Sequence, residues 1–129
     1  MIVLPILLMA AEPADSPPDC EDPQYQQLMN ICAAKEFEEA DKALNEQWKK
    51  TAAVMKQWDA DGAIDDGRPG YFATLLDGQR AWLAYRDKHC LSEGYLFRGG
   101  SMEPFMLSTC KTRLTKLRID ELRELESEQ

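Results

Sequence analysis

Apolar residues recur at intervals close to 3.6 along three long stretches of the chain, which predicts three amphipathic helices. The first stretch contains neither Gly nor Pro between Pro23 and Gly62. It predicts one helix over about residues 23–58, with Asp22 as the N-cap and Pro23 in the first helical position. Its apolar stripe consists of Tyr25, Met29, Cys32, Ala40, Leu44, Trp48, Thr51, Met55 and Trp58.

The other two helices each follow a turn-forming segment. Residues 59–70 are rich in Asp and Gly, which predicts a loop, and a second helix is expected over residues 71–91, ended by Gly94. Its inner residues are Phe72, Leu75, Leu76, Trp82, Leu83 and Cys90. A third helix is expected to begin with Ser101 as N-cap, and its highly charged last turns are expected to fray into solvent. Its stripe is Met106, Leu107, Cys110, Leu114, Leu117, Leu122 and Leu125.

The fold class follows from these three elements. No segment of residues 23–129 has the alternating pattern of a strand. A chain of 129 residues has room for one domain. The sequence therefore predicts an all-α domain, an antiparallel helical hairpin with a third helix packed on it.

The N-terminal segment has the character of an export signal. Residues 1–11 are uncharged and mostly apolar, too short for the roughly 20 residues that span a bilayer. They fit the apolar part of a secretory signal, although no Lys or Arg precedes them and position −3 before the cut is not small. A misplaced start codon would account for the missing basic residues. The alternative to a signal segment is that residues 1–11 form a buried tail or strand. Residues 12–22 are predicted to be a linker to the helical domain, residues 23–129.

Four cysteines, Cys20, Cys32, Cys90 and Cys110, predict two disulfides in an exported protein. If the first and third helices run parallel, Cys32 and Cys110 share a level, and Cys90 lies near the chain that follows Cys20. This favours Cys20–Cys90 with Cys32–Cys110, and Cys20–Cys32 with Cys90–Cys110 is the alternative. No lipid-attachment sequence precedes Cys20, so a soluble periplasmic or secreted form without a membrane span is expected.

The chemistry of the remaining residues indicates binding, with no candidate for catalysis. His89 is the single histidine and follows no metal-ligand spacing, so neither a metal nor another cofactor is expected. Neighbours on a helix point about 100° apart, so His89 and Cys90 do not form a nucleophile–base pair, and a disulfide would remove the thiol. No catalytic residue is predicted, and the protein is not expected to be an enzyme.

The charge balance bears on the partner. The chain has 23 acidic and 15 basic residues, a net charge of −8, which argues against nucleic acid and suits a basic protein partner or simple solubility. Four acids of the 59–70 loop resemble part of a calcium loop, but two residues before Gly62 and the bidentate Glu are missing. We therefore interpret them as a solvated turn and as candidate partner-binding residues: Asp59, Asp61, Asp65 and Asp66.

Four polar residues fall at inward positions of the first two helices. Asp41 and Asn45 lie beside the first stripe, and Gln79 and Arg86 share the second. If residue 58 lies opposite residue 71, Asp41 comes within one turn of Arg86. We interpret the four as a structural polar network that fixes the helix register; a polar binding spot is the alternative.

The four residues lie in a larger ordered set of segments: Cys20-x11-Cys32, Asp41-Lys42-Ala43-Leu44-Asn45, Gln79-Arg80-Ala81-Trp82-Leu83-Ala84-Tyr85-Arg86-Asp87-Lys88-His89-Cys90, Gly99-Gly100-Ser101 and Cys110-Lys111-Thr112-Arg113-Leu114-Thr115-x2-Arg118-x3-Leu122. This set resembles the LprI family of bacterial lysozyme inhibitors. The resemblance implies an exported helical domain that inhibits lysozyme; an accessory periplasmic protein with another partner is the alternative. The contact surface is expected at the acidic loop, with the opposite end around Tyr95, Phe97 and Arg98, between Gly94 and Ser101, as its rival.

Overall fold

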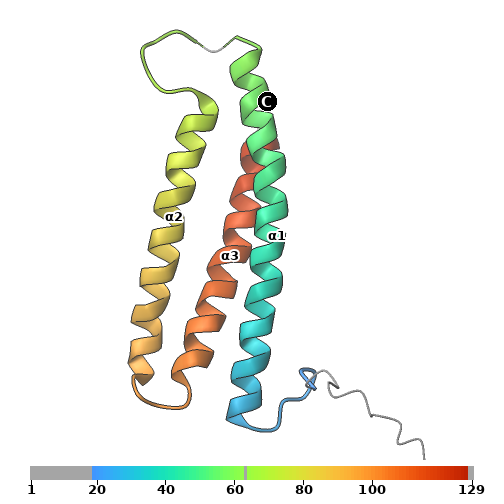
Figure 1. The fold of residues 1–129 in the computed structure, drawn as a ribbon, viewed down its shortest axis with the longest axis vertical. Coiled ribbons are helices and arrows are strands. Elements are labelled where there is room, and N and C mark those ends of the chain that lie inside the picture. The colour runs from blue at the N-terminus through green and yellow to red at the C-terminus, as the bar shows by residue number, and fades with distance from the viewer. Residues whose placement is uncertain (1–18, 63, 128–129) are drawn as a thin grey trace, which may run out of the picture.

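Three long helices make up the fold in the computed structural model, which describes residues 19–62 and 64–127 (Figure 1). Helix α1 spans Gln26–Ala60, α2 spans Tyr71–Gly94 and α3 spans Glu103–Ser127, with a short 3-10 turn, η1, at Tyr95–Phe97. Helices α1 and α3 run in the same direction and α2 runs against both (Figure 1). The all-α prediction is confirmed for the described residues. The expected signal segment lies outside them.

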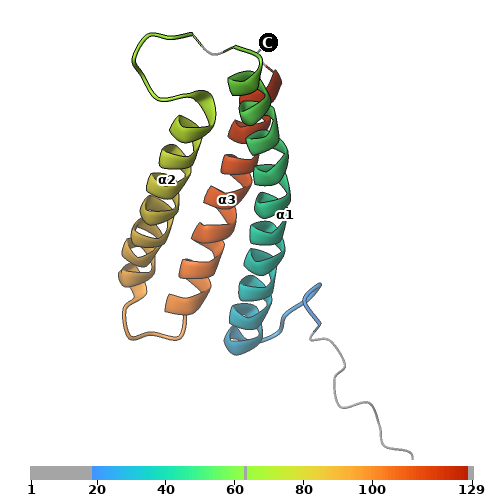
Figure 2. The ribbon, with the colours of Figure 1, turned by 45° about the horizontal axis from the view of Figure 1, so that its top comes forward.

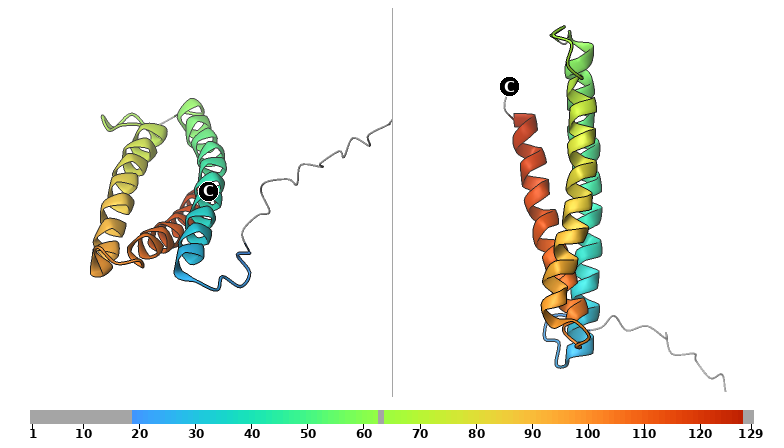
Figure 3. Two further views of the ribbon diagram at one scale, coloured as in Figure 1. Left: turned by 60° about the horizontal axis from the view of Figure 1, so that its bottom comes forward. Right: turned by 90° about the vertical axis from the view of Figure 1, so that its left-hand side faces the viewer.

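Helix α3 is the element that joins the bundle. It packs most extensively against α1 and less extensively against α2, while α1 and α2 make the smallest contact. The left view of Figure 3, with the lower end brought forward, shows the first turns of α3 between α1 and the end of α2. The predicted hairpin with a packed third helix is therefore present, and most of the contact between helices involves α3. None of the described helices has an apolar stretch long enough to cross a membrane.

The apolar core occupies the half of the bundle next to the 59–70 loop. Its buried residues are Leu44, Met55, Leu75, Ile119 and Leu122, and Trp48, Trp58, Phe72 and Trp82 pack around them. The Trp58 and Tyr71 rings meet edge to face with centroids 5.5 Å apart, a favoured geometry for aromatic pairs. This half is held by the hydrophobic effect and by aromatic packing.

Both disulfides lie in the other half. They join Cys20 to Cys32 and Cys90 to Cys110, so the favoured pairing of Cys20 with Cys90 was wrong and the alternative is correct. Cys90 near the end of α2 meets Cys110 near the start of α3, with Cα atoms 5.4 Å apart, because a short turn joins these antiparallel helices. The expectation that Cys32 and Cys110 lie at the same level of two parallel helices was therefore not sufficient to predict a bond between them. Each bridge stabilises the fold by about 3 kcal/mol.

The start of the first helix and the end of the second differ from the prediction. Helix α1 begins at Gln26, after an extended Tyr25, because the preceding chain turns back to bring Cys20 to Cys32. Gly94 is a buried, ordinary helical residue with φ −59°. A Cβ there would make only ordinary contacts, the nearest 3.5 Å from the carbonyl oxygen of Glu103, and this glycine does not end the helix by a left-handed turn.

The start and end of α3 also depend on contacts that the sequence did not indicate. The helix starts at Glu103, whose carboxylate accepts the Gly99 backbone N–H at 2.7 Å. Ser101, the expected N-cap, instead offers its carbonyl to Asn30 Nδ2 at 2.8 Å. The last turns do not fray before Ser127, since Glu126 Oε1 accepts hydrogen bonds from Gln47 Nε2 at 2.6 Å and Thr51 Oγ1 at 2.5 Å.

Helix α2 is capped by a residue from the end of α1. Asp59 Oδ1 accepts the Tyr71 backbone N–H at 2.8 Å, and its Oδ2 accepts that of Phe72 at 3.1 Å. A Cβ on Gly70 would lie 2.6 Å from Asp59 Oδ1, so only glycine leaves room for this carboxylate. The contact satisfies two N–H groups that a helix start otherwise leaves unpaired.

We therefore predict that Asp59→Ala lowers the free energy of unfolding by about 1 kcal/mol, the usual effect of removing a capping side chain. Asp65→Ala is the matched control, because Asp65 is exposed and its carboxylate makes no hydrogen bond within the described chain. Urea unfolding of both variants provides the comparison. Equal stability of the two would show that the cap does not contribute.

Candidate functional site

A buried guanidinium at mid-height connects the three helices. The Arg86 side chain on α2 is only 7% exposed, and its Nη1 lies 3.0 Å from Asp41 Oδ1 on α1. The same nitrogen donates to Thr115 Oγ1 on α3 at 3.3 Å. Its Nε contacts Asp87 at 3.0 Å. The structure thus brings Asp41 and Arg86 together and adds Thr115, which sequence reasoning missed although it falls on the inner stripe of α3.

Aromatic rings complete the surroundings of Arg86. Its guanidinium lies 5.1 Å from the ring centre of Phe37 and 5.2 Å from that of Trp82, within range for cation–π attraction. Lys111 also lies over Phe37, at 5.3 Å. The guanidinium is thus enclosed by two aromatic rings and hydrogen-bonded to residues of all three helices. This arrangement supports a role in packing and leaves no open surface for a ligand at Arg86.

The other two members of the predicted network are placed differently. Gln79 is buried, but its Oε1 accepts from Arg118 Nε at 2.9 Å and does not contact Asp41 or Arg86. Asn45 is exposed and makes no side-chain hydrogen bond within the described chain, so its assignment to the network was wrong. The physical reason is the small α1–α2 contact, which leaves the face of α1 that carries Asn45 largely uncovered.

The acidic loop joins α1 to α2 at the end brought forward in Figure 2, and three of its four carboxylates make contacts within the molecule. Asp59 caps α2, and Asp61 accepts from Gln57 Nε2 at 2.8 Å. Asp66 pairs with Arg68, whose side-chain and backbone hydrogen bonds lower the pKa of that carboxyl. Asp65 alone of the four proposed residues points at no such partner among the described residues. Of these four acids only Asp66 has its charge offset by a neighbouring cation in the part of the chain that the structure describes, so the loop keeps most of its negative charge.

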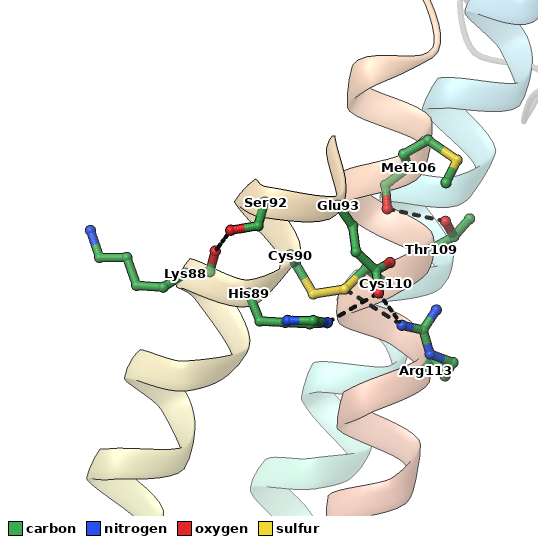
Figure 4. Close-up of polar contacts among 9 residues, drawn as sticks. All are labelled: Lys88, His89, Cys90, Ser92, Glu93, Met106, Thr109, Cys110 and Arg113. Carbon is green, nitrogen blue, oxygen red and sulfur yellow. Dashed lines mark hydrogen bonds and ion pairs between the residues drawn. A yellow bond between two sulfur atoms is a disulfide. The ribbon is translucent and has the colours of Figure 1, made fainter. Parts of the chain in front are cut away.

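A second polar cluster lies on the surface beside the Cys90–Cys110 bridge (Figure 4). Glu93 Oε1 lies 3.1 Å from His89 Nε2 and 2.7 Å from Arg113 Nη2. Burial alone would raise the pKa of Glu93, but the hydrogen bonds and charges of Arg113 and His89 outweigh it, so the pKa is lowered. His89, Glu93 and Cys110 Sγ approach within 4.8 Å of one another. Because Cys110 is bonded to Cys90, it offers neither a thiolate ligand nor a nucleophile.

The end formed by α2, η1 and α3 exposes large apolar side chains. Leu96 is 78% exposed and Tyr95 50% exposed, and Phe97 is also accessible. Arg98 follows them and lies over the Tyr95 ring, 4.5 Å from its centre. Tyr95, Phe97 and Arg98 were predicted from the sequence as possible contact residues, whereas Leu96, which is the most exposed apolar residue of this end, was not. The run of three apolar residues close before Gly99-Gly100 could have indicated it.

The comparisons with known proteins match nearly the whole domain. Residues 20–122 match the family described as lysozyme inhibitor LprI, a range that includes all four cysteines and most of the three helices. The chain belongs to the LprI family of lysozyme inhibitors. An uncharacterized protein of Rhizobium meliloti (strain 1021) is 40% identical over 126 residues, which cover 95% of this chain and 91% of that protein. No solved structure is significantly similar to the chain.

Membership in LprI agrees with the geometry of the candidate sites. The proteins of this family are inhibitors, which must present a surface to a partner. All four cysteines are in disulfides, as suits a protein folded in an oxidising compartment. The middle of the bundle is filled by Arg86 and its partners, and the two ends carry the loops, which are the usual location of recognition residues.

We predict that Arg86→Ala lowers the free energy of unfolding by about 3 kcal/mol, because a buried charge network loses its centre and Phe37 and Trp82 lose a packing partner. This value lies at the low end of the stability loss that follows removal of one partner of a buried ion pair, because the Asp41 side chain remains 39% exposed and can be rehydrated. The control variant is Arg80→Ala, on the exposed face of the same helix, which should change the free energy of unfolding by less than about 0.5 kcal/mol. Denaturant unfolding with an Arg86→Ala midpoint equal to that of Arg80→Ala would contradict the assignment.

Proposed function

We propose that this domain is an exported, periplasmic or secreted protein that binds a cationic lysozyme and inhibits it without catalysing a reaction. The observation that carries the proposal is the family match over residues 20–122. The net charge of −8 adds long-range attraction to a basic enzyme and raises the rate of encounter. The disulfide-stapled bundle supplies the rigid support that a competitive protein inhibitor needs.

The chemistry of the described residues supports binding over catalysis. Each thiol is consumed in a bridge, and His89 contacts Glu93 with no nucleophile beside it. A nucleophilic mechanism requires a base held against a free nucleophile. The ends of the bundle, in contrast, carry exposed charged and aromatic side chains of the kind that protein interfaces use.

We predict that the purified domain, from about Glu12 onward, inhibits a basic lysozyme at low ionic strength and inhibits it less as salt is added. The Debye length falls from about 10 Å at 0.1 M to about 3 Å at 1 M, which screens attraction between oppositely charged proteins. The measurement is the rate of cell-wall lysis as a function of domain concentration at two salt concentrations.

The matched control is the same chain reduced and capped with iodoacetamide, which keeps the net charge but loses both bridges. Inhibition by this chain equal to that of the native domain would identify a nonspecific polyanion effect. Full lysozyme activity in the presence of a large excess of native domain at low salt would contradict the proposal for that lysozyme and favour an accessory role with another partner.

A further inference from the structure

The α2–α3 end carries a run of adjacent exposed residues. Tyr95, Leu96 and Phe97 form η1, and none of them is buried. We call these three residues together with Arg98 the tip. Leu96, Phe97 and Arg98 also line a hollow with the first residues after them, Gly100, Ser101 and Met102. Adjacent apolar side chains left in water on a small soluble domain indicate a surface that becomes covered in a complex.

The backbone of the tip is held in place from several sides. The Arg98 N–H donates to the Tyr95 carbonyl at 3.2 Å, and the Gly100 N–H donates to the Phe97 carbonyl at 2.9 Å. Gly99, at φ +79°, donates to Glu103 Oε2 at 2.7 Å. The Cys90–Cys110 bridge closes the base of the same turn. A presented surface that is already fixed loses little conformational entropy on binding, which favours high affinity.

Arg98 gives the tip a charge opposite to that of the whole molecule. Its guanidinium lies 4.5 Å from the Tyr95 ring centre, and no carboxylate of the described chain is within ion-pairing distance of it. The exposed Arg68 of the other loop, in contrast, is paired with Asp66. An unpaired arginine among aromatic and aliphatic side chains suits an anionic site with apolar walls, and these residue types are the usual anchors of interfaces.

A basic lysozyme has this combination of properties. Its surface is cationic overall and attracts a domain of charge −8. As a glycoside hydrolase it holds a pair of carboxyl groups on either side of the scissile bond, at the bottom of its substrate cleft. An acidic protein with one cation on a protruding apolar tip is complementary to both features, whereas the acidic loop at the other end complements only the first.

We infer, on the basis of the function proposed above, that the tip is the inhibitory surface: Leu96 and the two aromatic side chains occupy the substrate cleft of the lysozyme, and Arg98 pairs with its catalytic carboxyl groups. Inhibition is then competitive with the glycan. The acidic loop stays outside the interface and acts only through its long-range field.

The decisive comparison is between Arg98→Gln and Arg80→Gln, assayed on a soluble chito-oligosaccharide substrate with a basic lysozyme. Both variants change the net charge from −8 to −9, and Arg80 is an exposed residue of α2 that has no ion-pair partner within the described chain. Arg98→Gln is expected to raise the inhibition constant by about tenfold or more. Arg80→Gln is expected to leave it unchanged or lower it slightly, because the domain becomes more anionic.

A second matched pair tests the apolar part of the tip at constant charge. Leu96→Ser is expected to raise the inhibition constant by about fivefold or more, and Ile64→Ser, an equally exposed residue in the other loop, is expected to change it less than twofold. Circular dichroism and the thermal midpoint check that each variant is folded.

The outcomes separate this inference from the proposed function. If the native domain inhibits but Arg98→Gln and Leu96→Ser inhibit as well as it does, the tip is not the contact and only the inference is overturned. The inference about the tip is also overturned if the double variant Asp61→Asn, Asp65→Asn loses inhibition while both tip variants retain it. Inhibition by the native domain that is not competitive with the glycan would overturn it as well. If the native domain does not inhibit at all, the proposed function is overturned and the inference with it.

Discussion

The Cys90–Cys110 bridge fixes the end of α2 that lies farthest from the apolar core. Leu75 is the single large aliphatic residue among the buried residues of α2, and Phe72 and Trp82 pack around the core from the same half of the bundle or from mid-height. Beyond Trp82 the buried residues are Arg86, Cys90 and Gly94, so the level of this part of α2 against α3 is set by the covalent link and by the polar contacts of Arg86. The position of the exposed tip, which continues directly from α2, follows from that level.

The bundle divides its stabilisation between its two ends. Large aliphatic and aromatic side chains gather toward the 59–70 loop, whereas the opposite half buries small residues and the Cys90–Cys110 bridge and also carries the more exposed Cys20–Cys32 bridge. Small domains bury a limited fraction of their surface and commonly use disulfides where the core is insufficient. The tip lies at the covalently held end, where its apolar residues remain exposed.

The sequence predicted the elements well and their lateral arrangement poorly, for physical reasons. Helical periodicity located three helices, and equal rise per residue placed Asp41 within reach of Arg86, because levels along antiparallel helices follow from counting residues. Counting does not tell which face of a helix meets which neighbour. The pairing of Cys110 with Cys90, the exposure of Asn45 and the capping of α2 by Asp59 all depend on that lateral arrangement.

Whether the Cys90–Cys110 bridge positions α2 and the tip can be measured by segment-resolved amide hydrogen exchange on the native domain and on the Cys90→Ala, Cys110→Ala double variant. We expect protection to fall across the second half of α2 and in η1 of the variant, while α1 and α3, which share the largest interface, keep theirs. Unchanged protection in α2 and η1, or an equal loss across all three helices, would contradict this role of the bridge.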